Sequence, residues 1–507
     1  QQPLFHDGVL PLFRSFLLSV LTGLLLMAMG GSAMAHPTIG LDPTLPADVT
    51  FAATDNIDYL GRFPEHAGTA GGTRLGDVYY VTDPRGIYTY DVSGDKAAAP
   101  ELLGSLVRFQ TTTGAALAQE DPDTDGNILL VDSSANPFTG AALTVVDVSD
   151  PSDLSVLATV PVTDHTWECA TGMLDTGQIA GCAYAFGRTG HIIDLTDPAE
   201  PEKLDYTWRQ IVGYGDTTNS PYTHDLTEIR PGPVMSAGST ALLMATSSLL
   251  AGDATGTREI TRTDESVHGH RFSSLGYHSV EWVAHTDGRL DDILVAGTEI
   301  APNGDLAGTD CDGSESVIET YDASAVAGAI AEWEAGTITF AEMKSRAAFA
   351  PVDSFDAAGR GLYVDGNAPA HVLYCAHWME FSPSFDGGGM LATSYYDRGT
   401  RFVPINADGT FGDESAWIVP LQGYSGSVQW VTEDVLFIHD YTRGMEVIRL
   451  GGEATGTYES ATATQILTSS FVPASSFHAD GVGPAAILLL GFGLLVIETR
   501  RRKTARR

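Results

Sequence analysis

Short apolar segments separated by turns run through most of the chain. Each is only a few residues long, and Gly, Asp and Pro gather between them, as where the apolar residues 143–146 lead into Asp147, Asp150 and Pro151. Segments of this length, bounded by turn residues, are typical of β-strands in antiparallel sheets. The pattern therefore predicts an all-β fold.

One element of this pattern repeats. An apolar strand ends in Asp, and a turn of the Ser/Thr-Asp-Pro type follows, most clearly at 143–151 and 191–198. A unit that recurs through a chain predicts an architecture assembled from copies of one structural element. Weaker copies occur at 87–93, 317–324, 402–405 and 445–448.

A second element precedes the first. It is a short alternating strand, a turn and another apolar strand, as in 377–382, 384–387 and 390–394. Groups of four short strands are typical of the blades of a β-propeller. A tandem of two-sheet sandwiches is the alternative, but the repeat runs through the whole chain. Seven blades are expected, because first strands occur near residues 70, 115, 165, 224, 278, 377 and 427.

Two segments depart from the repeat and set the domain boundaries. Residues 323–350 are rich in Ala and Glu without Pro, and predict a helical insertion. Residues 452–480 are rich in Ser, Thr and Ala and are typical of a stalk. The propeller is therefore expected at 55–451, after a lead-in at 36–54.

The first residues have the layout of a secretory signal peptide. Arg14 precedes an apolar stretch at 16–29, and the small residues end in Ala33-Met34-Ala35. This order predicts cleavage after Ala35, so that 1–35 is removed during export. A retained anchor is the alternative, although the stretch is short for a membrane span.

The last residues predict a hydrophobic anchor helix with a basic tail, at 481–507. Residues 483–497 are almost wholly apolar, and a run of arginines and a lysine follows. Basic residues beyond an apolar segment stay in the cytoplasm, which places the propeller outside, at the cell surface. A sorting signal that is removed and a plain tail anchor both remain possible.

The charge of the chain limits its partners. The formal net charge is −38, and an acidic surface of this kind repels nucleic acid and anionic lipid. Nucleic acid is therefore excluded as a partner, and the only membrane association expected is through the anchor. Adaptation to salt and a GC-rich genome would both give such a composition. We expect a monomer.

Four cysteines in an exported chain predict two disulfides. Cys169 and Cys182 flank one predicted hairpin, and this pairing leaves Cys311 with Cys375. Free buried thiols are the alternative.

The strand and turn at 143–151 resemble the repeat of the LVIVD-repeat propellers, which include bacterial surface proteins grouped by their choice of C-terminal anchor. The resemblance covers most of 55–450 and is clearest in the second and third repeats. It implies a surface propeller but no single activity.

Histidines occupy one position of the repeat. His165, His224, His278 and His377 each stand at the start of a predicted first strand. First strands line the axis of a propeller, so the four imidazoles are expected in an arc around one mouth of the channel. They either bond to neighbouring blades or bind iron, copper or zinc. If they bind metal, Asp164 and Asp225 are candidate hydrogen-bond acceptors for the rings.

Charged residues recur in the same frame. Glu168, Glu281 and Glu380 lie three residues after a histidine, which places them on the other face of the strand, and Glu228 lies one step later. Buried there, they would need partners. Four arginines at the second turn of a blade could pair with them, or could attract an anionic ligand: Arg85, Arg188, Arg398 and Arg443.

One acidic run has the spacing of a calcium loop. Asp121, Asp123 and Asp125 alternate before a glycine, so their oxygens could converge on one cation. Asn127 and Asp132 complete the candidate ligand set. A solvated turn between two strands is the alternative.

Two functions follow. The leading hypothesis is an exported surface propeller that binds a protein or glycan ligand through one face. The alternative is a metal-dependent enzyme, such as an oxidoreductase, with its metal on the axis. A propeller scaffold serves both kinds of function.

Overall fold

The computed structural model describes residues 51–69, 71–83, 85–107, 122–132, 142–162, 164, 166–173, 179–211, 223–229, 233–238, 241–245, 257–260, 277–298, 317–346, 349–355, 376–396, 398–420, 423–441 and 443–451. The predicted signal peptide, stalk and anchor lie outside these residues, as do His165, Asp121, Cys311 and Cys375.

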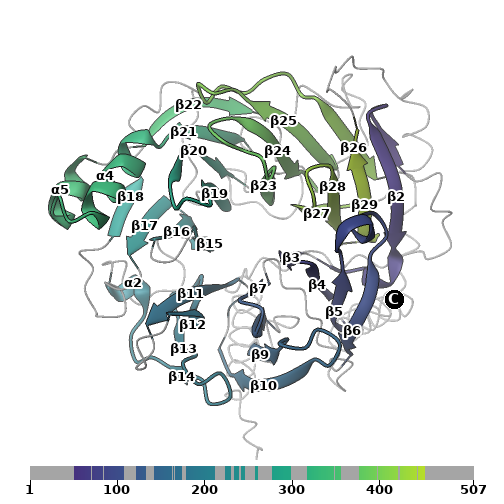
Figure 1. The fold of residues 1–507 in the computed structure, drawn as a ribbon, viewed down its shortest axis with the longest axis horizontal. Coiled ribbons are helices and arrows are strands. Elements are labelled where there is room, and N and C mark those ends of the chain that lie inside the picture. Colours follow the sequence, from purple (N-terminus) through teal and green to yellow (C-terminus); the bar gives the residue numbers. More distant parts are fainter. Residues whose placement is uncertain are drawn as a thin grey trace, which may run out of the picture.

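The described strands form seven antiparallel sheets arranged around a central axis, which is a β-propeller (Figure 1). The prediction of an all-β fold built from four-stranded antiparallel sheets is confirmed. The first four sheets follow one another along the chain. They contain β3 (Gly72–Leu75), β4 (Val78–Asp83), β5 (Gly86–Asp91) and β6 (Glu101–Leu106); β7 (Asp123–Thr124), β8 (Ile128–Asp132), β9 (Leu143–Asp147) and β10 (Ser155–Val160); β11 (Trp167–Met173), β12 (Ile179–Gly187), β13 (Ile192–Asp194) and β14 (Glu202–Lys203); and β15 (Thr223–Glu228), β16 (Pro233–Gly238), β17 (Ala241–Ala245) and β18 (Thr257–Ile260).

The last three sheets complete the ring, and two of them also contain strands from the start of the described chain. The fifth holds β19 (Ser279–Ala284), β20 (Leu290–Gly297), β21 (Ile318–Asp322) and β22 (Ala350–Phe355). The sixth holds β23 (Met379–Phe381), β24 (Gly389–Ser394), β25 (Thr400–Ile405) and β26 (Ala416–Pro420), with β1 (Phe51–Ala53) as a fifth strand. The seventh holds β27 (Ser425–Trp430), β28 (Val435–Asp440), β29 (Gly444–Leu450) and β2 (Ile57–Phe63).

The ring is closed by strands from opposite parts of the sequence. β2 pairs with β29 from Ile57 opposite Leu450 to Phe63 opposite Met445. β1 pairs with β26, where Phe51 lies opposite Pro420, so the propeller includes residues of the predicted lead-in. Two neighbouring sheets therefore each take their outermost strand from the start of the described chain.

Side chains of neighbouring sheets interlock to form the core. Between the second and third sheets, Leu130 and Val145 pack with Trp167, Ala185 and other buried residues. Burial of apolar area stabilises such contacts by about 25 cal/mol per Å². Since each sheet packs against a neighbouring sheet on both of its faces, strands such as β8 are buried at every position.

The repeated aspartate has the same role in four sheets. Asp147, at the end of β9, accepts hydrogen bonds from the backbone N–H and the hydroxyl of Ser149 at 3.0 and 2.6 Å. Aspartate favours turns because its side chain binds the backbone two residues ahead. This local bond explains the Asp-x-Ser/Thr pattern of the sequence. The other copies are Asp91 with Ser93, Asp194 with Thr196, and Asp322 with Ser324.

The helices of the described residues are short. α4 (Ser324–Glu334) and α5 (Phe340–Arg346) lie between β21 and β22, within the stretch for which a helical insertion is predicted. The remaining ones are α2 (Trp208–Ile211) and the 3-10 turns η2 (Pro64–His66) and η3 (Gly94–Ala98). No helix in this part of the chain is long and apolar enough to cross a membrane.

A disulfide joins the two inner strands of the third sheet. Cys169 of β11 is bonded to Cys182 of β12, with their Cα atoms 4.7 Å apart. The predicted pairing of these two cysteines is confirmed.

Candidate functional site

Histidines from three successive sheets lie at the innermost strands of the ring. His224 is in β15, His278 directly precedes β19, and His377 lies two residues before β23. All three are buried, with exposed fractions of 0, 1 and 0%. Figure 1 shows these strands lining the axis, because β15, β19 and β23 are the strands of their sheets closest to the centre.

The three imidazoles pack against one another. The ring centroids of His224 and His278 are 3.6 Å apart, and those of His278 and His377 are 4.3 Å apart. Aromatic side chains surround this axial cluster of three histidines. Trp378 lies edge-on to His278 at 5.3 Å, and Tyr396 lies 4.6 Å from His377. Sequence reasoning did not identify these aromatic residues, although Trp378 adjoins a histidine in the chain.

A backbone contact fixes the proton position on one ring. His377 Nδ1 bonds to the carbonyl oxygen of Gly426 in β27. A carbonyl only accepts, so Nδ1 carries the proton and Nε2 of the neutral ring carries the lone pair. Gly426 occupies the position of the histidine in the seventh sheet. A Cβ there would lie 2.6 Å from the ring of Tyr441, which leaves space only for glycine.

Carboxylates on the innermost strands bind the next sheet. An innermost strand is an edge strand, so the N–H groups on its unpaired edge need acceptors. Asp123 of β7 accepts from Cys169 N–H at 2.7 Å, Glu168 accepts from Glu228 N–H, and Glu380 accepts from Trp430 N–H at 2.5 Å.

Hydroxyl groups donate hydrogen bonds to backbone carbonyls near the same strands. Thr166 Oγ1 donates to the carbonyl of His224 at 2.7 Å, and Ser279 Oγ donates to that of His377 at 3.1 Å. The backbone at each of these two histidines is therefore held by the preceding sheet.

Burial keeps several of these acids protonated well above their ordinary range. It raises the pKa of Glu380 to about 8, against opposing hydrogen bonding from Trp430 N–H. Burial, with the nearby charges of Glu380 and Asp225, also raises the pKa of Glu281. The interior near the axis thus holds neutral carboxyl groups at pH values where surface acids are charged.

The raised pKa of Glu380 predicts a stability that falls with pH. Between 4.5 and about 8 the folded chain binds more protons than the unfolded chain, so this stability is complete below pH 4.5 and lost as pH rises through 8. From pH 6.5 to 8 we expect the unfolding free energy of the wild type to fall by about 2 kcal/mol more than that of Glu380→Gln. Glutamine keeps an oxygen acceptor for Trp430 and does not titrate.

Urea denaturation at the two pH values measures this difference. Burial lowers the pKa of His191 to about 4 and of His439 to about 3, so both rings are neutral across this window. The exposed Glu332→Gln variant serves as the control and should keep the wild-type slope. Equal slopes for Glu380→Gln and the wild type would contradict the prediction.

The four arginines at the second turns of the sheets have different surroundings. Arg85 lies 2.8 Å from Asp83, Arg188 lies 3.5 Å from Asp164, and Arg443 pairs with Glu446. Arg398 is buried, with 7% exposed. Asp83, Asp164 and Glu446, which meet three of these arginines, are not the glutamates with which the sequence suggested pairing, namely Glu168, Glu281 and Glu380. Asp164 also accepts from Thr189 at 2.6 Å, so it orders this turn.

The candidate calcium residues are placed on two strands and a turn. Asp123 belongs to β7, the inner strand of the second sheet, and its carboxylate accepts from Cys169 N–H; the first strand expected near 115 lies outside the described residues. Asp125 accepts from Asn127 and Ile128 N–H at 2.8 and 3.0 Å, and Asp132 is buried at the end of β8. These backbone bonds occupy carboxylate oxygens that the sequence assigned to a cation. Calcium binding stays a prediction.

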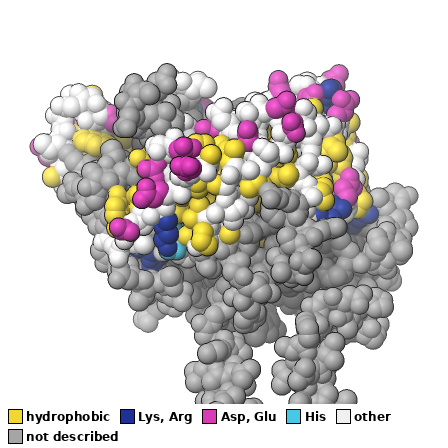
Figure 2. Space-filling model, turned by 90° about the horizontal axis from the view of Figure 1, so that it is seen from below, with side chains coloured by type: hydrophobic (Ala, Val, Ile, Leu, Met, Phe, Trp, Pro, Cys, Tyr) yellow, Lys and Arg dark blue, Asp and Glu magenta, His cyan; other side chains and the backbone are white. Residues whose placement is uncertain are grey.

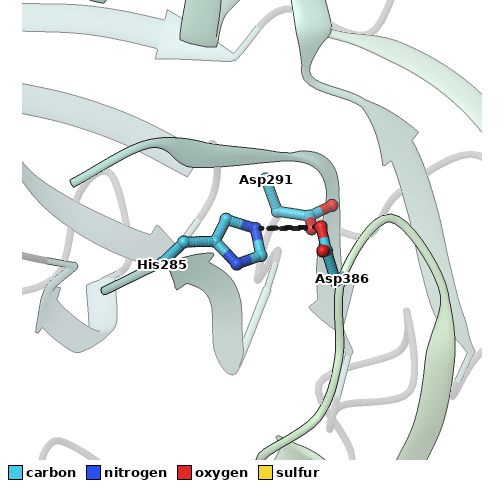
Figure 3. Close-up of side chains that lie close together, drawn as sticks. All are labelled: His285, Asp291 and Asp386. Atoms are coloured by element: carbon cyan, nitrogen blue, oxygen red, sulfur yellow. Dashed lines mark hydrogen bonds and ion pairs between the residues drawn. The ribbon is translucent and has the colours of Figure 1, made fainter. Parts of the chain in front are cut away.

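A second group of possible metal ligands lies on a seam between sheets (Figure 3). His285 follows β19, Asp291 is in β20, and Asp386 comes from the turn between β23 and β24. Their ligand atoms lie within 4.8 Å of one another, and His285 Nε2 is 3.0 Å from Asp291 Oδ2. Because its members come from two sheets, no sequence spacing indicates it.

A positively charged side chain, Arg289, already pairs with this group of ligands. Arg289 Nη2 lies 2.8 Å from Asp386 Oδ1, and Asp291 accepts from the N–H of Ile293 and of Gly387 at 2.8 and 2.7 Å. The contacts therefore clamp the fifth sheet to the sixth.

Comparisons with known proteins find similar solved structures but no matching family. No protein-family model matches the chain, and no curated protein matches it in sequence. Among solved structures, it is similar to the N-terminal domain of Nup159, with 9% identity, a TM-score of 0.39 and coverage of 82% of this chain and 100% of that one. YCF48 bound to D1 peptide is 10% identical, with a TM-score of 0.42 and coverage of 81% of this chain and 100% of that one. The extracellular domain of a putative hybrid two-component system from B. thetaiotaomicron is 10% identical, with a TM-score of 0.42 and coverage of 77% of this chain and 39% of that one.

Proposed function

We propose that this chain is a seven-bladed propeller of the LVIVD-repeat kind, exported and held at the cell surface, which binds a transition metal ion on its axial histidines. The observation that carries the proposal is the packing of His224, His278 and His377, whose ring centroids are separated by only 3.6 and 4.3 Å. Imidazoles more than about 8 Å apart could not share an ion at bond lengths near 2.0–2.1 Å.

The donor set fits iron, copper or zinc, for which neutral imidazole is a preferred ligand. His377 has the protonation that ligation requires, since its Nδ1–H is held by Gly426. The 3.6 Å separation of His224 and His278 is a stacking distance, so binding through both rings requires one of them to rotate. His165, from the preceding repeat, is a candidate fourth ligand. The ion would supply an open position for a ligand at the mouth of the propeller.

Metal binding is tested with the middle ring of the axial cluster. We expect the wild type to bind one equivalent of Co²⁺ or Zn²⁺, and His278→Ala to bind it at least about 100-fold more weakly, because one ligand is lost. His191→Ala, which removes a partly buried imidazole from another sheet, should bind as the wild type does. Titration calorimetry and metal analysis of protein from its native envelope measure both. Equal affinity in His278→Ala and the wild type would refute the site.

A metal-dependent oxidoreductase is the second candidate. It is favoured by the ring of Trp378, which lies within 5.3 to 6.3 Å of all three imidazoles, and by Tyr396 beside His377. A binding module that recognises a protein or glycan at the same mouth needs no such aromatic shell. Oxidation or reduction of the bound ion, followed by absorption spectroscopy, distinguishes the two.

A further inference from the structure

Tyr396 has a backbone conformation that side chains avoid. Its φ is 41°, and it is the only residue other than glycine with a positive φ in the described part of the chain. The left-handed region costs an L-residue about 1–2 kcal/mol, whereas glycine enters it freely and asparagine more easily than tyrosine. A tyrosine at such a position indicates that its ring is used, because strained residues concentrate at functional sites.

The ring of Tyr396 packs on the axial cluster. It is 1% exposed, and its centroid lies 4.6 Å from that of His377. On another side it stacks with Tyr441 at 6.0 Å. The side chain therefore fixes one face of the imidazole.

The backbone of Tyr396 positions the hydrogen-bond acceptor of the same imidazole, the Gly426 carbonyl. Its N–H donates to the carbonyl of Ser425 at 3.1 Å, and its carbonyl accepts from Ser425 N–H at 3.0 Å. This reciprocal pair locks the start of β27. The next residue, Gly426, provides the carbonyl that binds His377 Nδ1. One strained residue thus determines both the ring face and the hydrogen-bond acceptor of His377.

We infer that Tyr396 is a positioning residue, which holds His377 with its proton on Nδ1 and its lone pair on Nε2. The purpose of this positioning rests on the proposed metal site, because that tautomer of His377 is the one that binds metal through Nε2. The effect of Tyr396 on the His377 ring rests only on the contacts of Tyr396, Ser425 and Gly426. The two can therefore be tested separately.

The first measurement needs no metal. In ¹⁵N-histidine NMR spectra of the metal-free chain, with the His377 signals assigned by their loss in His377→Asn, we expect Nδ1–H in the wild type and in Tyr396→Phe. Tyr396→Asn tolerates the left-handed backbone but lacks the ring, and should show a mixture of tautomers. Tyr395→Asn is the matched control. Tyr395 is a buried tyrosine of the same turn that packs on Phe355, and its loss should leave the His377 tautomer unchanged.

The second measurement is the affinity for Co²⁺. It should fall about 10–100-fold in Tyr396→Asn, the cost typical of losing a residue that orients a ligand, and stay near the wild-type value in Tyr396→Phe and Tyr395→Asn. A wild-type proton on Nε2 of His377 overturns the inference whether or not any variant folds. So does an unchanged tautomer in Tyr396→Asn, or an equal change in Tyr395→Asn. If the tautomer responds as expected but the wild type binds no metal, the positioning role stands and the proposed function fails.

Discussion

Replacing Arg401 with methionine is expected to lower the free energy of unfolding by about 3–5 kcal/mol. Arg401 lies in β25 with none of its surface exposed, and its Nη1 is 3.3 Å from Glu414 Oε1. Its Nε donates to the carbonyl of Arg398 at 3.1 Å, and its guanidinium lies 5.7 Å from the ring of Trp417. Methionine fills similar volume but leaves the carboxylate of Glu414 buried without this cation.

Two further variants isolate the cause of this effect. The double variant Arg401→Met with Glu414→Leu removes both charges, and should be far closer to the wild type than Arg401→Met is. Arg346→Met breaks an ion pair of 2.7 Å with Glu332 in which both side chains are about half exposed, and should cost less than about 1 kcal/mol. Chemical denaturation measures all three. A cost for Arg401→Met no larger than that for Arg346→Met would contradict the prediction.

Asp83→Ala is the second substitution with a large expected effect, again about 3–5 kcal/mol of unfolding free energy. Asp83 is completely buried and accepts from Arg85 N–H at 2.6 Å, Gly86 N–H at 3.1 Å and Arg85 Nη2 at 2.8 Å. His66 Nδ1, in the turn that follows β2, lies 3.0 Å away. Alanine removes the acceptor of the buried His66 and Gly86 N–H groups and of the partly exposed Arg85, and loosens the link between β2 and the first sheet.

An exposed aspartate with the same local bonds is the matched control. Asp150 accepts from Ser152 N–H and Oγ at 2.9 and 2.7 Å, and Asp150→Ala should cost about 1 kcal/mol or less because water replaces the lost bonds. Thermal and urea unfolding compare the two. Equal losses in both variants would show that burial of Asp83 does not determine its contribution.

Local features of this fold could be predicted from the sequence. The turn after Asp147 depends on bonds to Ser149, two residues away, so the pattern indicated it directly. The pairing of Cys169 with Cys182 is equally local, since both lie in one hairpin. The first strand expected near residue 115 lies outside the described residues, and the described inner strand β7 (Asp123–Thr124) has an acidic pattern that favours a loop.

The candidate site could be predicted only in part. The repeat placed His224, His278 and His377 at the starts of inner strands, because a frame repeated in sequence becomes a ring in space. The same frame places Gly426 at the histidine position of the seventh sheet, but it does not indicate Tyr396, which meets His377 through the turn between β24 and β25. His285, Asp291 and Asp386 come together for the same nonlocal reason.

The pairing of β2 with β29 has a consequence for how the chain folds. β2 can pair with β29 only after the chain has been synthesised as far as Leu450, so the seventh sheet forms when almost the whole propeller is complete. Contacts this distant in sequence make folding slow. Until they form, the edge of β29 is open to strands of other molecules. The yield of the folded chain should therefore depend on protein concentration during refolding, even though each sheet is built largely from neighbouring strands.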